Sequence, residues 1–227
     1  MTPTPWVLVT GNGAYGDTAV RTDLRYDENP SSAVARALDG EVLAGHRVVG
    51  RSIDWDLDPA EALAPLMLDG EPPVAVIGCG VFSGRTTVTV ERVAINVQDF
   101  QFADGGRRPA GEPIVPGGAP AYLATLPIKA MAQAMRAAGV PALISNSAST
   151  HGCNAVMYAA LRIADEKGLP SRCGFVHLPD PPEHVAQMRS NGPSMSLDLQ
   201  VRAVRAGIEA TLAHPVDIVD PVNEWEW

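Results

Sequence analysis

Short apolar, β-branched runs alternate with amphipathic stretches along the chain. The apolar runs predict strands at residues 6–10, 46–53, 74–77, 88–95, 142–145 and 174–179. The amphipathic stretches predict helices at residues 29–38, 59–68, 121–138, 153–167 and 194–213. Strands that alternate with helices in this way are typical of α/β proteins. We therefore expect an α/β fold with a mostly parallel sheet covered by helices.

Two connecting segments have unusual compositions. Residues 104–118 are rich in glycine, proline and charge and predict a long surface loop, which in a compact domain is often functional. Residues 11–16 (GNGAYG) match the form of a dinucleotide-binding loop. A helix is not predicted directly after this loop, and the acidic residue expected about 20 positions later is ambiguous. A nucleotide cofactor is therefore not favoured.

Composition narrows the class of protein. The 227 residues fit one domain spanning 1–227, and 46% hydrophobic residues provide a core. The sequence predicts no defined structure for the acidic tail from about residue 214. A net charge of −9 without basic clusters argues against nucleic acid or membrane partners. The chain starts without a signal-peptide pattern, and its three cysteines form neither a zinc pattern nor a disulfide framework. We expect a cytoplasmic protein with free thiols.

Cys153 lies where a strand and a polar turn meet the start of a predicted helix. The free N–H groups and the positive end of a helix dipole stabilise a thiolate at such a position. The same N–H groups can hold the oxyanion that forms when an amide carbonyl is attacked. Most free cysteines are instead small buried apolar residues, so the position alone leaves both interpretations open.

His177 is placed at the carboxyl end of a predicted buried strand. In open α/β sheets the active crevice lies outside these strand ends. A histidine there can deprotonate a thiol and then protonate a leaving amine, whereas a core histidine bonded to the backbone is the alternative. His46, His184 and His214 have weaker placement and are predicted to lie at the surface.

Glu91 falls within an otherwise apolar, β-branched stretch. A buried carboxylate is costly unless it is paired, and the adjacent Arg92 faces the opposite side of a strand. Glu91 therefore either pairs with a residue from elsewhere, such as a histidinium, or lies on an exposed edge strand. Together the three candidates indicate a cysteine hydrolase of amide bonds, with Cys153 as nucleophile, His177 as base and Glu91 orienting the histidine.

Three segments resemble signature segments of the pyrrolidone carboxyl peptidases, also called pyroglutamyl peptidases. Residues 84–96 (GRTTVTVERVAIN) resemble the glutamate signature, residues 145–154 the cysteine signature and residues 175–179 (FVHLP) the histidine segment. Smaller matches follow the family's order at residues 29–31, 112–114, 125–128 and 193–197. The resemblance therefore covers nearly the whole chain, and several spaced matches in one order are far more specific than any single match.

The resemblance implies a single α/β/α sandwich, a twisted sheet with helices on both faces. It gives Cys153, His177 and Glu91 the roles of a catalytic triad. Members of the family remove an N-terminal pyroglutamyl residue from peptides, need no metal and commonly form dimers or tetramers. We accordingly expect a thiol peptidase without a cofactor, a homodimer or homotetramer that acts on a peptide or small cyclic amide.

The substrate-binding positions depart from the family's pattern. Members usually clamp the flat pyrrolidone ring between aromatic side chains, and the equivalent positions here are Asn12, Tyr15 and His151. An arginine that helps to hold the oxyanion is replaced by Gln101, whose amide donates a hydrogen bond without a full charge. Val81 is the further substrate-binding position that we assign.

The turn before the cysteine differs as well, because Ser149 stands where the family favours glycine. Three functions therefore stay open. The first is removal of N-terminal pyroglutamyl groups. The second is hydrolysis of a different, more polar cyclic or acyl amide by the same residues. The third is a binding protein that has lost catalysis, which the complete set of three catalytic residue types argues against.

Overall fold

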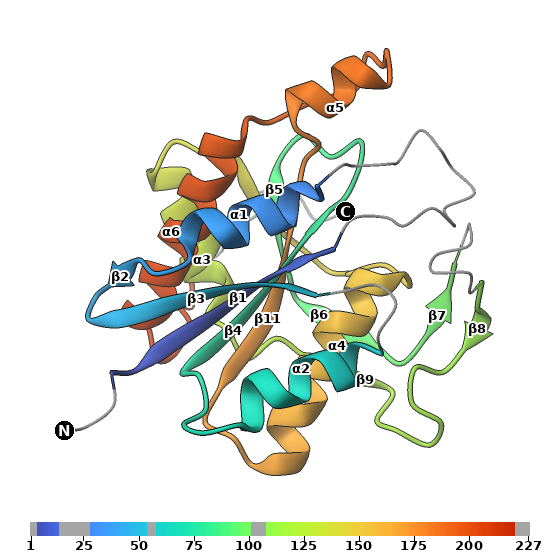
Figure 1. The fold of residues 1–227 in the computed structure, drawn as a ribbon, viewed down its shortest axis with the longest axis vertical. Helices are drawn as coiled ribbons and strands as arrows, with labels where there is room; N and C mark the ends of the chain where they lie inside the picture. Colours follow the sequence, from blue (N-terminus) through green and yellow to red (C-terminus); the bar gives the residue numbers. More distant parts are fainter. Residues whose placement is uncertain (1–3, 14–27, 54–57, 101–107, 221–227) are drawn as a thin grey trace.

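The computed structural model describes residues 4–13, 28–53, 58–100 and 108–220. The strands of its main sheet are β1 (Trp6–Asn12), β2 (Val42–Leu43), β3 (His46–Ile53), β4 (Ala75–Val81), β5 (Val88–Glu91), β10 (Ala142–Ser145) and β11 (Arg172–Leu178). They lie in the order β10-β5-β11-β4-β1-β3-β2 (Figure 1). Only the β5–β11 and β2–β3 pairs of this sheet are antiparallel, which confirms the predicted mostly parallel arrangement.

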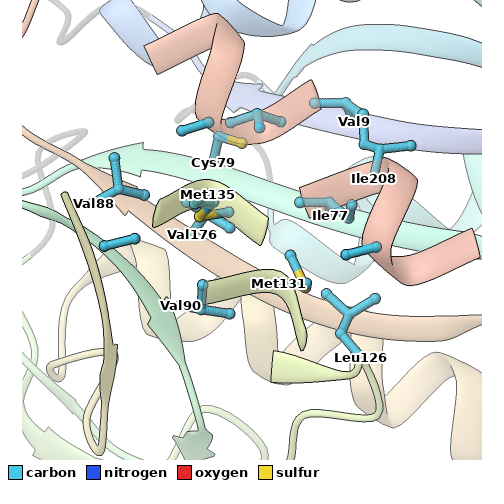
Figure 2. Packing of buried hydrophobic residues seen from close by; sticks show 14 of the residues in the cluster. Val9, Ile77, Cys79, Val88, Val90, Leu126, Met131, Met135, Val176 and Ile208 are labelled. Atoms are coloured by element: carbon cyan, nitrogen blue, oxygen red, sulfur yellow. The ribbon is translucent and has the colours of Figure 1, made fainter. Parts of the chain in front are cut away.

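Helices cover both faces of the sheet. They are α1 (Pro30–Leu38), α2 (Pro59–Leu68), α3 (Ile128–Ala137), α4 (Gly152–Lys167), α5 (Pro182–Gln187) and α6 (Leu197–Ala213). Side chains of α1, α3 and α6 share one buried cluster with the sheet, and those of α2 and α4 share another. Alternate strand residues enter opposite clusters, as Val9 and Leu8 of β1 do. Figure 2 shows part of the first cluster, with Ile77 and Val176 of the sheet near Met131 of α3.

Two predicted elements are divided in the structure. The strand predicted at 88–95 ends at Glu91, and β6 (Val93–Ile95) leaves the main sheet to pair with β9 (Ala121–Leu123). The helix predicted from residue 121 therefore begins only at Ile128. Pro127 disfavours helical backbone in the residue before it, and the main-chain hydrogen bonds of β6 hold the chain extended further upstream.

Two further predictions needed correction. The strand expected to stop before Gly78 continues to Val81, because β4 is paired on both sides, with β1 and β11. The loop predicted at 104–118 contains β8 (Ala110–Glu112), which pairs with β7 (Gln98–Asp99); residues 104–107 lie outside the described residues. In the described part of the chain, no helix has the length and apolarity needed to cross a membrane.

Candidate active site

Strand alternation brings the candidate residues to one face of the sheet. Val90 and Val176 point into the cluster under α3 and α6, so Glu91 and His177, their neighbours, point toward α4. Cys153 is the second residue of α4, at the helix end that reaches this part of the sheet. The first N–H groups of a helix have no partner within the helix, so this end offers donors to a negative charge.

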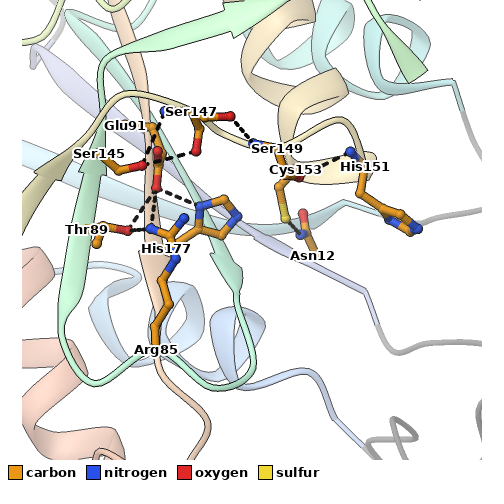
Figure 3. A network of polar contacts seen from close by, with 10 residues as sticks. All are labelled: Asn12, Arg85, Thr89, Glu91, Ser145, Ser147, Ser149, His151, Cys153 and His177. Atoms are coloured by element: carbon orange, nitrogen blue, oxygen red, sulfur yellow. Dashed lines mark hydrogen bonds and ion pairs between the residues drawn. The ribbon is translucent and has the colours of Figure 1, made fainter. Parts of the chain in front are cut away.

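Glu91 and His177 form a fully buried pair. The Nδ1 atom of His177 lies 2.8 Å from Oε1 of Glu91 (Figure 3), and the two side chains are 1% and 0% exposed. Arg92 instead donates from Nε to Oδ1 of Asn146, at 2.7 Å. The distant partner that a buried Glu91 requires is therefore a histidine. The alternative prediction, that Glu91 lies on an exposed edge strand, is wrong.

Two further side chains hold the same carboxylate oxygen. Thr89 donates its hydroxyl to Oε1 of Glu91 at 2.8 Å, and Nη1 of Arg85 donates to that oxygen at 2.8 Å. Arg85 also donates to the Thr89 hydroxyl. Sequence reasoning did not assign a role to either residue. Thr89 could have been found from its spacing, since residues two apart on a strand share a face.

The charges around His177 change the proton affinities of the pair. Burial raises the pKa of the Glu91 carboxyl, but the hydrogen bond and charge of His177 and the charge of Arg85 outweigh it and hold that pKa below its ordinary value. Burial lowers the pKa of His177. The charge of Cys153, a hydrogen bond with Cys153 and the Glu91 carboxylate together raise it to about 9. A protonated His177 imidazole, hydrogen-bonded to the Glu91 carboxylate, is therefore favoured at neutral pH.

Aromatic rings flank the imidazole. Phe82 and Phe175 approach His177 edge-on, with ring centroids at 5.3 and 5.0 Å. The guanidinium of Arg85 lies over the Phe82 ring, 4.3 Å from its centroid. These contacts restrict rotation of the imidazole and reinforce the direction that Glu91 gives it.

The turn before Cys153 is braced by serine side chains. Ser149 has a φ of 66°, in the left-handed region that favours glycine. Its N–H donates to Oγ of Ser147 at 3.1 Å, and its own Oγ accepts from the N–H of His151 at 3.2 Å. The serine hydroxyls thus stabilise a left-handed turn conformation that glycine adopts with less strain. These hydrogen bonds account for a serine at position 149, where the family favours glycine.

The predicted substrate-binding residues have different positions. Asn12, at the end of β1, donates from Nδ2 to Sγ of Cys153 at 3.3 Å. Val81 ends β4 and is partly exposed. The ring of His151 stacks on Phe100 with centroids 3.9 Å apart, and in Figure 3 it points away from the Cys153 sulfur. The other two predicted substrate-binding residues, Tyr15 and Gln101, lie outside the described residues.

The prediction that His184 lies at the surface is wrong. His184 is 3% exposed, and its Nδ1 lies 2.9 Å from Oδ1 of Asp180. Asp180 also accepts hydrogen bonds from the Ser83 hydroxyl at 3.1 Å and the Gly84 N–H at 3.3 Å. The burial was missed because α5, the short helix that carries His184, was not predicted. His46 and His214 are both partly exposed.

The glycine-rich segment after β1 is described up to Gly13. A Cβ atom at Gly11 would lie 2.3 Å from the carbonyl oxygen of Ser31 and the nitrogen of Ser32, in the first turn of α1. This glycine therefore permits close packing of β1 against α1. In the described ranges, no group of three or more His, Cys, Asp or Glu side chains is arranged to hold a metal ion.

Comparisons with known proteins agree with this geometry. Residues 6–214 match the family model described as pyroglutamyl peptidase. Pyrrolidone-carboxylate peptidases of Mycobacterium bovis and Escherichia fergusonii are 42% and 38% identical over 221 and 218 residues, which cover 95% and 94% of this chain and 96% and 95% of theirs. A solved mutant pyrrolidone carboxyl peptidase from Pyrococcus furiosus is 34% identical, with a TM-score of 0.84 over 92% of this chain and 99% of its own. The chain belongs to the pyroglutamyl peptidase family.

Proposed function

We propose that this protein is a cysteine peptidase that removes the pyroglutamyl group from the N-terminus of peptides. Cys153 is the nucleophile, His177 the general base and acid, and Glu91 the residue that orients and charges the histidine. The observation that carries the proposal is the buried His177–Glu91 hydrogen bond of 2.8 Å, beside a cysteine at the start of α4. Family membership over residues 6–214 supplies the substrate class.

The reaction proceeds in two halves. The Cys153 thiolate attacks the carbonyl carbon of the pyroglutamyl amide, and the carbonyl electrons move to oxygen. N–H groups at the start of α4 stabilise this oxyanion. His177 then gives its proton to the leaving amine, the C–N bond breaks and a thioester remains. Water then gives a proton to His177 and attacks the thioester carbon. The C–S bond breaks, pyroglutamic acid leaves, and the Cys153 thiolate and the protonated His177 are restored.

Glu91 serves this cycle through His177. Its carboxylate accepts from Nδ1, so Nε2 is the atom left to exchange a proton with the nucleophile and the leaving group. Arg85 and Thr89 keep the carboxylate charged and fixed, and thereby keep the imidazole protonated until the leaving amine takes the proton.

The test is the release of a fluorophore from a pyroglutamyl-amide reporter by the purified protein. We expect turnover that disappears in the variant Cys153→Ala. Equal fluorescence from wild type and variant would show that the activity does not come from this site. A matched prolyl-amide reporter, which lacks the lactam carbonyl, is the specificity control and should be cleaved far more slowly.

A second candidate substrate is a more polar cyclic or acyl amide. The observation that favours it is the carboxamide of Asn12, a polar group placed at the nucleophile. A pocket that hydrogen-bonds a polar substrate discriminates more strongly than an apolar one. Competition of cyclic ureas and small acyl amides with the pyroglutamyl reporter distinguishes the two, since a preferred polar amide would inhibit at lower concentration than a pyroglutamyl peptide.

Three broader proposals accompany the activity. We propose that residues 1–227 act as one hydrolase domain, that the protein works in the cytoplasm, and that it assembles as a homodimer or homotetramer. The free thiols of Cys79, Cys153 and Cys173 support a reducing location. Light scattering during size-exclusion chromatography tests the assembly, and a monomeric mass would overturn it.

A further inference from the structure

Asn12 is in direct contact with the nucleophile. Its Nδ2 atom donates to Sγ of Cys153 at 3.3 Å, and the residue is 3% exposed (Figure 3). A neutral thiol is only a weak hydrogen-bond acceptor, so this contact strengthens when the sulfur carries a negative charge. The carboxamide is therefore placed to respond to the charge of the reacting atom.

The backbone of Asn12 is fixed by the first turn of α1. Its N–H donates to Oγ of Ser31 at 3.0 Å, and its carbonyl accepts from Oγ of Ser32 at 2.6 Å. Both serines belong to a helix that Asn29 caps, with its Oδ1 accepting from the Ser31 N–H at 3.0 Å. These bonds on both sides of its Cα fix the backbone from which the Asn12 side chain reaches the sulfur, and such fixed placement is what a catalytic group requires.

Gly80 leaves room for the contact. A Cβ atom at this position of β4 would lie 2.6 Å from Sγ of Cys153 and 3.0 Å from Nδ2 of Asn12. Any side chain here would therefore push the sulfur and the amide apart. The bare backbone of β4 is a third, independent feature that permits Asn12 and Cys153 to meet.

Resting on the proposed cysteine mechanism, we propose that Asn12 is a catalytic residue that donates a hydrogen bond to the negative charge throughout acylation. The charge resides first on Sγ. When the S–C bond forms and the carbonyl π electrons move to oxygen, the charge lies two bonds from Sγ, near the same donor. Nδ2 then donates to the oxyanion together with the N–H groups at the start of α4.

The experiment compares Asn12→Leu, which keeps the size but removes the donor, with Asn12→Asp, which is isosteric and replaces the donor by an acceptor. Loss of one oxyanion donor lowers kcat by about 10²–10³-fold. We expect a fall of this order in both variants, deeper in Asn12→Asp, with KM for the pyroglutamyl reporter changed by less than about 3-fold. Alkylation of Cys153 by iodoacetamide at neutral pH should also slow, because fewer molecules hold the thiolate.

Two outcomes overturn the proposal. One is a kcat and an alkylation rate in both variants within about 3-fold of wild type. The other is a loss confined to KM, which would make Asn12 a substrate-binding residue only. Thermal unfolding of each variant identifies a folding defect. If Asn12→Leu is destabilised, the proposal is judged on the kcat and alkylation rate of the isosteric Asn12→Asp. If the wild type cleaves no pyroglutamyl reporter, the proposed function fails, while the alkylation rates still test the contact between Asn12 and Cys153.

Discussion

Two buried histidines in this protein make almost the same hydrogen bond, yet only His177 interacts with Cys153, the proposed nucleophile. Nδ1 of His177 lies 2.8 Å from Glu91, and Nδ1 of His184 lies 2.9 Å from Asp180. The first pair joins residues 86 positions apart, on the neighbouring strands β11 and β5. The second joins residues four positions apart, at the start of α5.

The surroundings of the two carboxylates differ in kind. Glu91 accepts a hydrogen bond from Arg85, and its histidine interacts with Cys153, the proposed nucleophile. Asp180 accepts hydrogen bonds from the Ser83 hydroxyl and the Gly84 N–H, and these bonds connect the segment between β4 and β5 to the start of α5. A histidine–carboxylate pair is therefore a local building unit, and what lies beyond the histidine decides whether it serves catalysis or packing.

The largest expected effect is from His177→Ala. Without the imidazole, the thiol has no base and the leaving amine no proton donor. Removal of the base from a comparable hydrolase triad lowers kcat by about 10⁶-fold, so we expect a loss of at least about 10⁴-fold here. Reporter hydrolysis at high enzyme concentration measures it, with Cys153→Ala to set the background. A loss below about 10-fold would remove His177 from the mechanism.

The next effect in size is from Glu91→Gln. The amide keeps the shape but loses the charge that orients and protonates His177, and we expect kcat/KM to fall by about 10³–10⁴-fold. Circular dichroism serves as the control for folding. Activity close to that of the wild type would mean that the buried pair is as purely structural as His184–Asp180.

The pH dependence follows from the same pair. The Glu91 carboxylate helps to raise the pKa of His177 from its ordinary 6.5 to about 9. The contribution of His177 to the free energy of unfolding is thus complete below about pH 6.5 and is lost as the pH rises through about 9. The contribution of Glu91, whose pKa is lowered, is present above its ordinary value of 4.5 and is lost at lower pH. Activity should fall over the same alkaline range. In Glu91→Gln the residual activity should fall at lower pH, and an unmoved alkaline limb would contradict the assignment.

A smaller effect is expected from Arg85→Met. The substitution leaves the Thr89 hydroxyl and His177 on Glu91 but removes a charge-assisted hydrogen bond, a contact that contributes about 1.5–3 kcal/mol. Only part of this is lost in the transition state, so we expect kcat/KM to fall by about 10-fold. Arg85→Lys should recover part of the loss, and no recovery would show that the planar contact with the Phe82 ring matters more than the charge.

The smallest effect on catalysis is expected from His184→Asn. The residue is buried, and asparagine can still donate to Asp180 but leaves the space of the imidazole ring unfilled, so we expect the free energy of unfolding to fall by about 1–3 kcal/mol. The kcat/KM value should stay within about 3-fold of wild type. Urea unfolding and reporter hydrolysis on the same preparation separate the two quantities. A 100-fold loss of activity without a loss of stability would erase the distinction between the two histidines.

Local sequence patterns were enough to predict much of this fold. The elements α2, β3 and β10 have the predicted bounds, because a capping aspartate followed by proline, and β-branched runs, act over a few residues. Residues 121–123 were misassigned to a helix, since their pairing with β6 is a long-range contact that leaves no local pattern.

The same division applies to the site. Glu91 and Cys153 could be found because one is a charge in an apolar run and the other starts a helix. The contact of Arg85 with Glu91 and the burial of His184 depend on how loops and α5 fold over the sheet. Those positions follow from tertiary packing, which a single sequence does not specify residue by residue.

The most direct test is to trap the covalent intermediate. Wild-type protein is mixed with an activated pyroglutamyl ester, quenched in acid and analysed by intact-mass and peptide mass spectrometry. The mechanism predicts a pyroglutamyl thioester on Cys153, which forms far more slowly in His177→Ala and at the normal rate in His184→Asn. An acyl group on another residue, or equal acylation of Cys153→Ala, would contradict it.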